Sequence, residues 1–296
     1  MTKTAIGIAA IVVLITTPTW AADMALKAPP PVPVYSWNGC YVGANAGWIN
    51  LQSSATLSPT GSYLTPAGPL APPNAAGTGA LAGDLAAVTD SLSWNRSAFA
   101  GGAQVGCNWQ IQHLVLGAEA DFDGTTLDPT TSASFGPVRS SNPLFTVSSH
   151  SDSVSERMEW YSTIRGRVGY AQDRWLIYAT GGFAGANFSS STNVSFGANG
   201  TSPVYANAVQ LGSAATTRGG GVVGAGFEYA ITNYWTVRAE YLYFSFPGFS
   251  YSSPLVAPAG VAPGYTWNTS LGTERVSTVR VGVNYKFGWP WTFAMR

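Results

Sequence analysis

Charge and long hydrophobic runs are both scarce in this sequence. Charged residues make up only 9% of the 296 residues, whereas typical soluble domains carry roughly 25%. A helix that crosses a bilayer needs about 20 consecutive, mostly apolar residues, and no segment after residue 21 approaches that length. These two absences argue against an ordinary soluble domain and against a helical membrane protein. A transmembrane β-barrel fits both, because alternation dilutes its apolar residues.

A surplus of one charge, a metal-binding pattern and a phosphate-binding motif are also missing. Acidic and basic residues balance at 14 each, so nothing suggests a nucleic-acid partner. Two cysteines and two histidines at unrelated spacings match no zinc pattern. The glycines at 219–221 and 224–226 precede no predicted helix, so barrel packing explains them better than phosphate binding. The sequence therefore predicts no catalytic, cofactor-binding or metal-binding residues.

What the sequence does contain is alternation with a period of two, most clearly in residues 278–287. Every second position from Val279 to Phe287 is apolar or aromatic, whereas the positions between them are polar or glycine and include Arg280 and Lys286. Successive side chains of a β-strand point to opposite faces. The apolar face is either the core side of a soluble sheet or the lipid side of a membrane barrel. One strand does not decide between them.

Eight segments share this pattern and are predicted to be strands. They are residues 37–50, 94–109, 113–123, 156–171, 174–188, 217–230, 234–246 and 273–287. None of the 19 prolines falls within these segments. This agrees with the exclusion of proline from closed sheets, where it would remove a hydrogen-bond donor from the ladder.

The connections between these strands alternate between long and short. The long ones are residues 51–93, 124–155, 189–216 and 247–272, and the short ones are residues 110–112, 172–173 and 231–233. Structureless loops of such length are uncommon in compact domains but typical of outer-membrane barrels, whose extracellular loops are long and periplasmic turns short. The predicted fold is all-β: an eight-stranded antiparallel up-and-down transmembrane β-barrel with four long extracellular loops and three short periplasmic turns.

Charged residues of the predicted strands share the phase that points away from lipid. They predict a lumen charge network of Glu119, Asp121, Glu159, Arg165, Arg167, Glu228, Arg238, Glu240 and Arg280. In mid-depth hydrocarbon each Arg or Lys would cost about 2–4 kcal/mol, whereas opposite charges can pair inside a narrow barrel. Eight strands leave an interior about wide enough for side chains to fill. We therefore expect a plugged lumen; the alternative is that these charges lie on the wet face of a soluble sandwich.

Aromatic residues gather near the strand ends on the short-turn side. They are Trp109, Tyr170, Trp175, Trp235, Tyr285 and Phe287. Trp and Tyr favour a membrane interface because they combine an apolar body with a polar tip. We expect a membrane girdle here, with ordinary core packing as the alternative.

Both ends of the chain are predicted to lie outside the barrel of residues 37–287. Residues 1–21 have the pattern of a signal peptide cleaved before Ala22, with Lys3 at the positive start and an apolar run over residues 5–15. A retained anchor is the alternative. Residues 22–36 are a Pro-rich periplasmic linker, and residues 288–296 are a short C-terminal tail. With export and the predicted transmembrane barrel together, we expect the protein in the cell outer membrane.

Several motifs occur in an order that is typical of one family. They are the Pro-rich lead into residues 34–43 (VYSWNGCYVG), then 101–110 (GGAQVGCNWQ), 165–170 (RGRVGY), 179–182 (ATGG), 224–229 (GAGFEY), 240–241 (EY) and 281–287 (VGVNYKF). With them the chain resembles the small porin-like outer-membrane β-barrel proteins of alphaproteobacteria, relatives of the OmpA-type eight-stranded barrel. The resemblance spans roughly residues 22–287. It implies outer-membrane residence and structural, surface-antigen or porin-like roles, with no catalytic residues to transfer.

Two features depart from the family pattern. Members usually end at the aromatic residue of the last strand, which the barrel-assembly machinery recognises. The resemblance thus implies an insertion signal at Tyr285 and Phe287, here followed by residues 288–296. Cys40 and Cys107 stand where many relatives have aromatics. Because both would lie near one rim of neighbouring antiparallel strands, in the outward phase, we predict a disulfide between them, with two free thiols as the alternative.

Three functions from different classes remain open. The first is a structural or surface-interaction barrel, whose long loops are the candidate surface for an extracellular ligand. The second is a low-conductance porin for small solutes, which needs a continuous wet path past the inward charges. The third, an outer-membrane enzyme, rests on His150-Ser151-Asp152 and is the least favoured, because adjacent residues rarely face one another. Outer-membrane lipid and the barrel-assembly machinery are the expected partners.

Overall fold

The computed structural model describes residues 35–61, 89–135, 138–139, 146–147, 150–196, 209–256 and 265–287. No helix in these ranges is long and apolar enough to cross a membrane. The strands are β1 (Gly39–Gly61), β2 (Asp90–Ile111), β3 (Leu114–Leu127), β4 (Thr130–Phe135), β5 (Val138–Arg139), β6 (Thr146–Val147), β7 (His150–Gln172), β8 (Trp175–Phe196), β9 (Val209–Ala230), β10 (Trp235–Phe246), β11 (Ser250–Val256), β12 (Tyr265–Leu271) and β13 (Glu274–Phe287). The predicted signal peptide, most of the predicted linker and the C-terminal tail lie outside the described residues.

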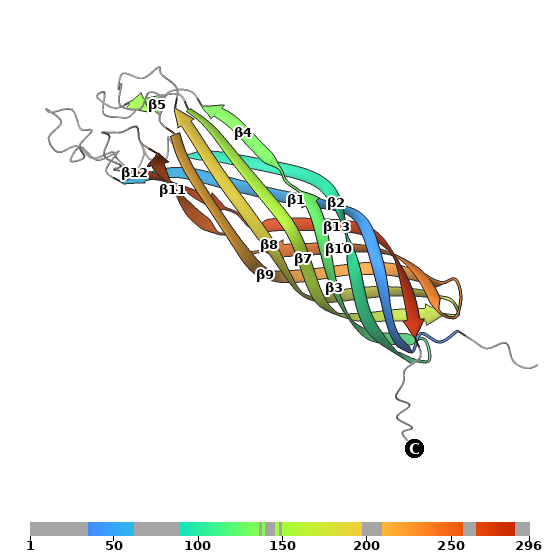
Figure 1. Cartoon of the computed structure of the whole chain (residues 1–296). Helices are drawn as coiled ribbons and strands as arrows, with labels where there is room; N and C mark the ends of the chain where they lie inside the picture. Colours follow the sequence, from blue (N-terminus) through green and yellow to red (C-terminus); the bar gives the residue numbers. More distant parts are fainter. Residues whose placement is uncertain are drawn as a thin grey trace, which may run out of the picture. The chain divides into compact units, whose positions relative to one another are not determined.

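Eight of these strands close into a ring, and each pairs antiparallel with both neighbours (Figure 1). The ring runs β1–β2–β3–β7–β8–β9–β10–β13 and returns to β1. Closure removes the unpaired strand edges that an open sheet would expose. The predicted all-β, eight-stranded antiparallel barrel is confirmed.

Three tight turns lie at one end of the barrel, which we name the turn end; the opposite end is the loop end. Gln112-His113 connects β2 to β3, Asp173-Arg174 connects β7 to β8, and residues 231–234 connect β9 to β10. Gln112 and Asp173 have positive φ angles of 56° and 49°, which two-residue hairpin turns favour. The short connections therefore lie next to their predicted positions.

The four segments predicted as long irregular loops are strand for much of their length, which corrects the prediction. β1 extends to Gly61 although its predicted end is residue 50, and β8 and β9 enter the predicted loop of residues 189–216 from both sides. β4 pairs with β7 beyond the end of β3. The β11–β12 hairpin fills the wall between β9 and β1. The barrel wall thus continues past the lipid-facing part of the strands, and we name this part the extension.

This misassignment arises because the polarity of the alternation reverses along each strand. In β1 the outward side chains change from Val42 and Trp48 to Gln52, while the inward ones change from Asn45 to Leu51. The extension is therefore a water-facing sheet whose interior is built largely of apolar residues, with a few buried charged groups among them. A pattern defined by apolar outward residues detects only the lipid-facing part of each strand.

Aromatic side chains border both sides of the lipid-facing band. At the turn end the rings of Trp235 and Tyr285 are 5.1 Å apart and both are exposed. At the opposite border Trp48 is 68% exposed, and Phe122 stacks on Trp160 with ring centroids 5.5 Å apart. Exposed aromatics at two levels match the interfacial belts of membrane barrels. The sequence pattern had indicated only the belt on the turn side.

Candidate functional site

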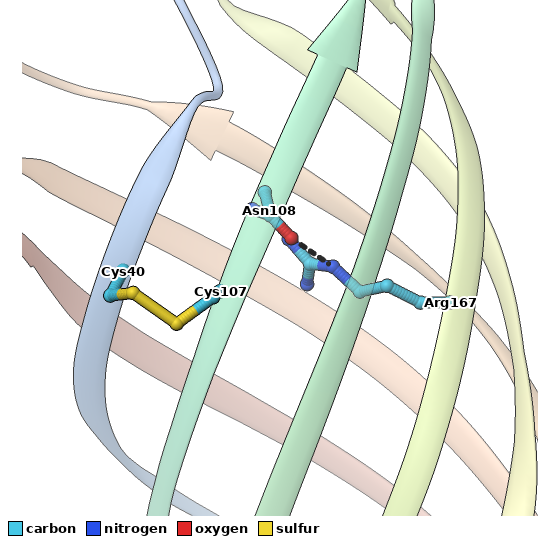
Figure 2. The surroundings of a disulfide bond; sticks show 4 residues. All are labelled: Cys40, Cys107, Asn108 and Arg167. Carbon is cyan, nitrogen blue, oxygen red and sulfur yellow. Dashed lines mark hydrogen bonds between the residues drawn. A yellow bond between two sulfur atoms is a disulfide. The ribbon is translucent and has the colours of Figure 1, made fainter. Parts of the chain in front are cut away.

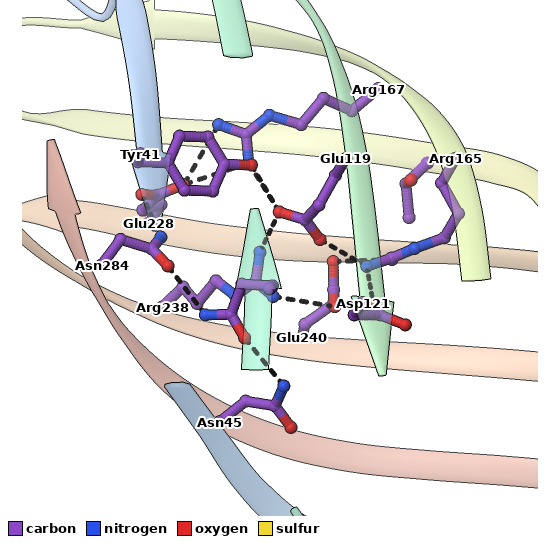
Figure 3. Close-up of polar contacts among 12 residues, drawn as sticks. Tyr41, Asn45, Glu119, Asp121, Arg165, Arg167, Glu228, Arg238, Glu240 and Asn284 are labelled. Carbon is purple, nitrogen blue, oxygen red and sulfur yellow. Dashed lines mark hydrogen bonds and ion pairs between the residues drawn. The ribbon is translucent and has the colours of Figure 1, made fainter. Parts of the chain in front are cut away.

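Buried charged side chains fill the interior at the level of the lipid-facing band (Figure 3). This charge cluster consists of Glu119, Asp121 and Asp123 of β3, Arg165 and Arg167 of β7, Glu228 of β9, Arg238 and Glu240 of β10, and Arg280 of β13. Each member is at most 5% exposed. The side chains converge from facing walls of the barrel, so opposite charges meet across its axis.

Arg165 joins carboxylates from two different strands. Its Nη2 donates to Glu119 Oε1 at 2.5 Å and to Asp121 Oδ2 at 2.8 Å, while its Nη1 donates to Glu240 Oε1 at 3.1 Å. Its Nε donates to Thr163 Oγ1 at 2.9 Å. The planar guanidinium is suited to several charge-assisted hydrogen bonds in one plane. One arginine of β7 thus ties β3 to β10.

Arg280 contacts an overlapping set of carboxylates from the opposite direction. It donates to Asp121 Oδ2 at 2.6 Å, to Glu240 Oε2 at 2.8 Å and to Asp123 Oδ2 at 3.1 Å. Asp121 and Glu240 are therefore shared between Arg165 and Arg280. Shared partners of this kind make the cluster a network, so removing one member leaves several others incompletely paired.

The part of the cluster nearer the turn end is paired in the same way. Arg238 Nη1 donates to Glu119 Oε2 at 2.5 Å, and the Tyr41 hydroxyl donates to the same oxygen. Arg167 Nη1 donates to Glu228 Oε2 at 3.2 Å. Hydrogen bonds that satisfy the remaining lone pairs are what allow ions to be buried without a large net cost.

Uncharged polar residues complete the cluster, although the sequence pattern did not single them out. Gln104 donates to Asn284 Oδ1 at 2.7 Å and accepts from Asn45 Nδ2 at 2.7 Å. Asn108 accepts from Arg167 Nε at 2.9 Å (Figure 2). The signal that identifies them is their inward phase, which they share with the charged residues on the same strands.

Inward glycines leave space for large partners of the cluster. A Cβ atom added at Gly106 would overlap the side chain of Tyr41, and one added at Gly226 would overlap that of Tyr178. The Tyr178 hydroxyl donates to Glu240 Oε1 at 3.0 Å. The glycines therefore permit two tyrosines to reach carboxylates across the lumen.

Glu159 is the predicted network member that lies elsewhere, and this is a correction. Its side chain is 48% exposed and lies 3.6 Å from Arg157. The register of β7 against β8 shifts between Met158 and Tyr161. A β-bulge inserts one residue and so exchanges the inward and outward phases. Beyond the bulge the inward carboxylate is Glu156, which is fully buried.

Apolar layers enclose the charge cluster on both sides. The layer toward the loop end includes Ile49, Leu51, Met158, Tyr161, Phe188, Leu242, Phe244, Phe246 and Val276. The layer toward the turn end includes Tyr35, Trp37, Val115, Ala171, Leu176 and Ala230. The rings of Tyr161 and Phe244 meet edge to face at 5.2 Å, and those of Phe188 and Phe246 at 5.4 Å. These packed aromatic rings lie between the charge cluster and the loop end.

A second buried charged group lies in the extension, outside the membrane-spanning part of the strands. Arg218 Nη2 is 4.0 Å from Glu156 and 3.8 Å from Glu274, and both carboxylates are fully buried. Burial raises the pKa of Glu274 to about 8, and the charge of Glu156 is the second cause. Burial also raises the pKa of Glu156. Because one arginine faces two buried carboxylates, the Glu156–Glu274 pair favours binding one proton.

We expect Glu274→Gln to reduce the pH dependence of stability. Between the ordinary carboxyl pKa of 4.5 and about 8 the folded protein holds a proton that the unfolded chain releases, so the free energy of unfolding falls as pH rises. This loss is at most about 1.4 kcal/mol per pH unit. Urea unfolding at pH 6 and pH 7 measures it, with the exposed Glu159→Gln as control. Equal pH slopes for the wild type and Glu274→Gln would contradict a shared proton.

The segment His150-Ser151-Asp152 begins β7 at the loop end and does not form a histidine–serine pair. The side chains of His150 and Asp152 are buried, whereas the Ser151 hydroxyl donates to the backbone oxygen of Ala133 at 3.3 Å. His150 Nε2 lies instead 2.6 Å from Asp90 Oδ2. The alternation of the strand thus turns the serine away from its two neighbours.

Cys40 and Cys107 form a disulfide between β1 and β2 at the turn end (Figure 2). They are direct partners in the antiparallel ladder. Tyr285 and Phe287, the expected insertion signal, are 41% and 40% exposed on β13 at the same end of the barrel. Phe287 pairs with Cys40 in the ladder, so the last aromatic residue lies beside the disulfide.

The chain is similar to known outer-membrane proteins over nearly all its length. Residues 8–287 match the model of a family described as the outer membrane protein beta-barrel domain. The 31 kDa outer-membrane immunogenic protein of Brucella melitensis is 31% identical over 289 residues, which cover 95% of this chain and 98% of the relative. The 22 kDa outer membrane protein of Rhizobium leguminosarum is 27% identical over 189 residues, 64% of this chain and 66% of that protein.

Similarity to a solved structure is weaker. The outer membrane protease OmpT of Escherichia coli shares 9% identity, with 87% of this chain and 99% of that chain covered and a TM-score of 0.43.

Proposed function

The chain belongs to the outer-membrane β-barrel domain family and is a protein of the outer membrane, and from this premise we propose that it is a closed structural barrel whose extension serves interactions at the cell surface. The observation that carries the proposal is the filled interior. A charge cluster lies between two apolar layers, and its arginines and carboxylates use one another as partners. An interior packed in this way favours rigidity over transport.

The outer face of the extension supports the surface role. Most of its outward positions are polar, for example Ser54 on β1 and Ser191 on β8, and polar outward residues suit a wall that stands in water. The connections at the loop end leave the wall from strand ends that lie beyond the lipid-facing band, such as Gly61 of β1. These connections, within residues 51–93, 124–155, 189–216 and 247–272, are the proposed surface for an extracellular ligand. The name of the Brucella relative, an immunogenic protein, agrees with exposure of this end.

Cysteine labelling on intact cells tests this orientation. Ser54→Cys, exposed on the extension, is expected to react with a membrane-impermeant maleimide. Asn233→Cys, exposed in a tight turn, is the matched control and is expected to react only after the outer membrane is permeabilised. The native cysteines are joined in a disulfide and do not interfere. Labelling of Asn233→Cys but not Ser54→Cys on intact cells would refute the proposed orientation.

A low-conductance porin is the second candidate function. It is favoured by the polar lining at the membrane level, where Gln104 and Asn284 join the charged residues. It requires water to pass both the charge cluster and the apolar layers. Contacts such as that between Tyr161 and Phe244 would have to open for ions to cross. Outer-membrane lipid and the barrel-assembly machinery are the proposed partners in either case.

A further inference from the structure

Three side chains with metal-binding atoms meet inside the extension, close to the loop end. Asp90 is the first residue of β2, and His150 and Asp152 lie at the start of β7. One ligand atom from each lies within 4.8 Å of the other two. His150 Nε2 is 2.6 Å from Asp90 Oδ2 and 3.9 Å from Asp152 Oδ1. We name these three residues the rim triad.

The rim triad is buried and one member lacks a hydrogen-bond donor. The side chains of His150 and Asp152 have no exposed surface, and that of Asp90 is 8% exposed. Within the described residues, neither carboxylate oxygen of Asp152 has a hydrogen-bond partner. A buried carboxylate without a donor is costly. Asp152 Oδ1 lies 3.9 Å from His150 Nε2, so this carboxyl group faces the imidazole.

Apolar and aromatic side chains surround the rim triad. The His150 ring lies 5.3 Å from that of Trp267 and stacks on that of Phe135 at 5.4 Å. Leu57 is the ladder partner of Asp90, and Val194 that of Asp152; both are fully buried. In the described part of the chain, both carboxylates form their ion pairs with His150. Two acidic groups therefore share one imidazole in a dry environment.

We propose that the rim triad binds a divalent transition-metal ion of the zinc class through His150 Nε2 and one oxygen each from Asp90 and Asp152. One imidazole and two carboxylates are a donor set that suits zinc and its neighbours, whereas calcium and magnesium favour oxygen ligands alone. Three protein ligands leave a fourth position for water. The apolar surroundings limit competition from solvent.

Binding requires a small rearrangement and the displacement of one proton. Tetrahedral zinc ligands at about 2.0–2.1 Å from the metal lie about 3.3 Å from each other. The Nε2–Asp90 separation of 2.6 Å must therefore widen as the ion replaces a hydrogen bond. The ring binds through a deprotonated Nε2, so the proton between Nε2 and Asp90 in this contact leaves for Nδ1 if the ring is neutral, or for water if the ring is protonated. The bound ion would join the rims of β2 and β7 and stabilise the wall that carries the surface connections.

The test is zinc titration of the folded full-length protein in detergent, purified without a polyhistidine tag. Calorimetry is expected to show one saturable site in the wild type, and His150→Gln and Asp152→Asn are expected to weaken its affinity at least about tenfold. The chain has two histidines, so His113→Gln at the turn end is the matched control and should bind like the wild type. Cobalt substitution supplies a visible absorption band that reports ligation directly.

These experiments distinguish the absence of the metal site from a failure of the protein to fold and from a failure of the proposed function. Heat-modifiable migration on a gel verifies the barrel in each variant before titration. A folded wild type without saturable zinc binding, or equal binding by the wild type and His150→Gln, would overturn the metal site. Surface labelling of Ser54→Cys is independent of zinc and continues to report the orientation of the barrel.

Discussion

Replacement of Arg165 by methionine is expected to lower the free energy of unfolding by about 3–5 kcal/mol, the usual cost of removing one partner from a buried ion pair. The substitution leaves Glu119, Asp121 and Glu240 without one of their donors. Water cannot replace that donor readily, because these carboxylates are at most 5% exposed. Urea unfolding in lipid vesicles, followed by tryptophan fluorescence, measures the loss.

The matched control for this substitution lies on the same strand. Arg157 has a side chain that is 58% exposed, and it pairs with Glu159 at 3.6 Å. Exposed ion pairs contribute about 0–1 kcal/mol, so Arg157→Met should unfold almost like the wild type. Arg165→Lys retains the charge without the planar fork and is expected to fall between the two. If Arg165→Met were folded and as stable as Arg157→Met, the charge cluster would not hold the barrel together.

The substitution Ile164→Arg is expected to lower the free energy of unfolding by about 2–4 kcal/mol. This is the penalty for an arginine that faces lipid at the mid-depth of a barrel. Ile164 is 72% exposed, whereas the adjacent Arg165 is 2% exposed. Neighbouring residues of one strand therefore have opposite requirements: the inward position needs an arginine and the outward position excludes one. Unfolding of Ile164→Arg in vesicles measures the penalty.

Ser191→Arg is the control for the lipid-facing substitution. Ser191 is also exposed, but it lies on β8 in the extension. An arginine there faces water, so its effect should stay within about 0.5 kcal/mol, the range of ordinary surface substitutions. Equal effects of Ile164→Arg and Ser191→Arg would mean that lipid does not cover the outer face at position 164.

The lipid-facing part of the fold is predictable because the bilayer imposes one rule on every strand. Val279, Val281 and Val283 are exposed, and an unbroken apolar phase of that kind identifies a strand and its outer face at once. The same rule assigns Arg165, Arg238 and Arg280 to the interior. The tight turns follow because few residues separate the ends of neighbouring strands.

The remaining parts of the fold and of the candidate site depend on features that this alternation rule does not describe. The bulge between Met158 and Tyr161 exchanges the inward and outward phases. No residue type in the local sequence indicates it, so the alternation places Glu159 on the wrong face. The extension does not follow this rule, because serine and threonine replace apolar residues on its outer face. The contact of Asp90 with His150 joins residues 60 positions apart in sequence, and only the pairing of β3 with both β2 and β7 brings them together.

The central claim is that the charge cluster and its two apolar layers fill the barrel, and single-channel conductance in planar bilayers tests it most directly. The protein should first be shown to be folded by heat-modifiable migration. We predict no discrete current steps from the folded wild type, because an ion crossing the barrel would have to displace the packed rings and the paired charges. Reproducible steps that disappear when the same sample is unfolded by heat would contradict the account.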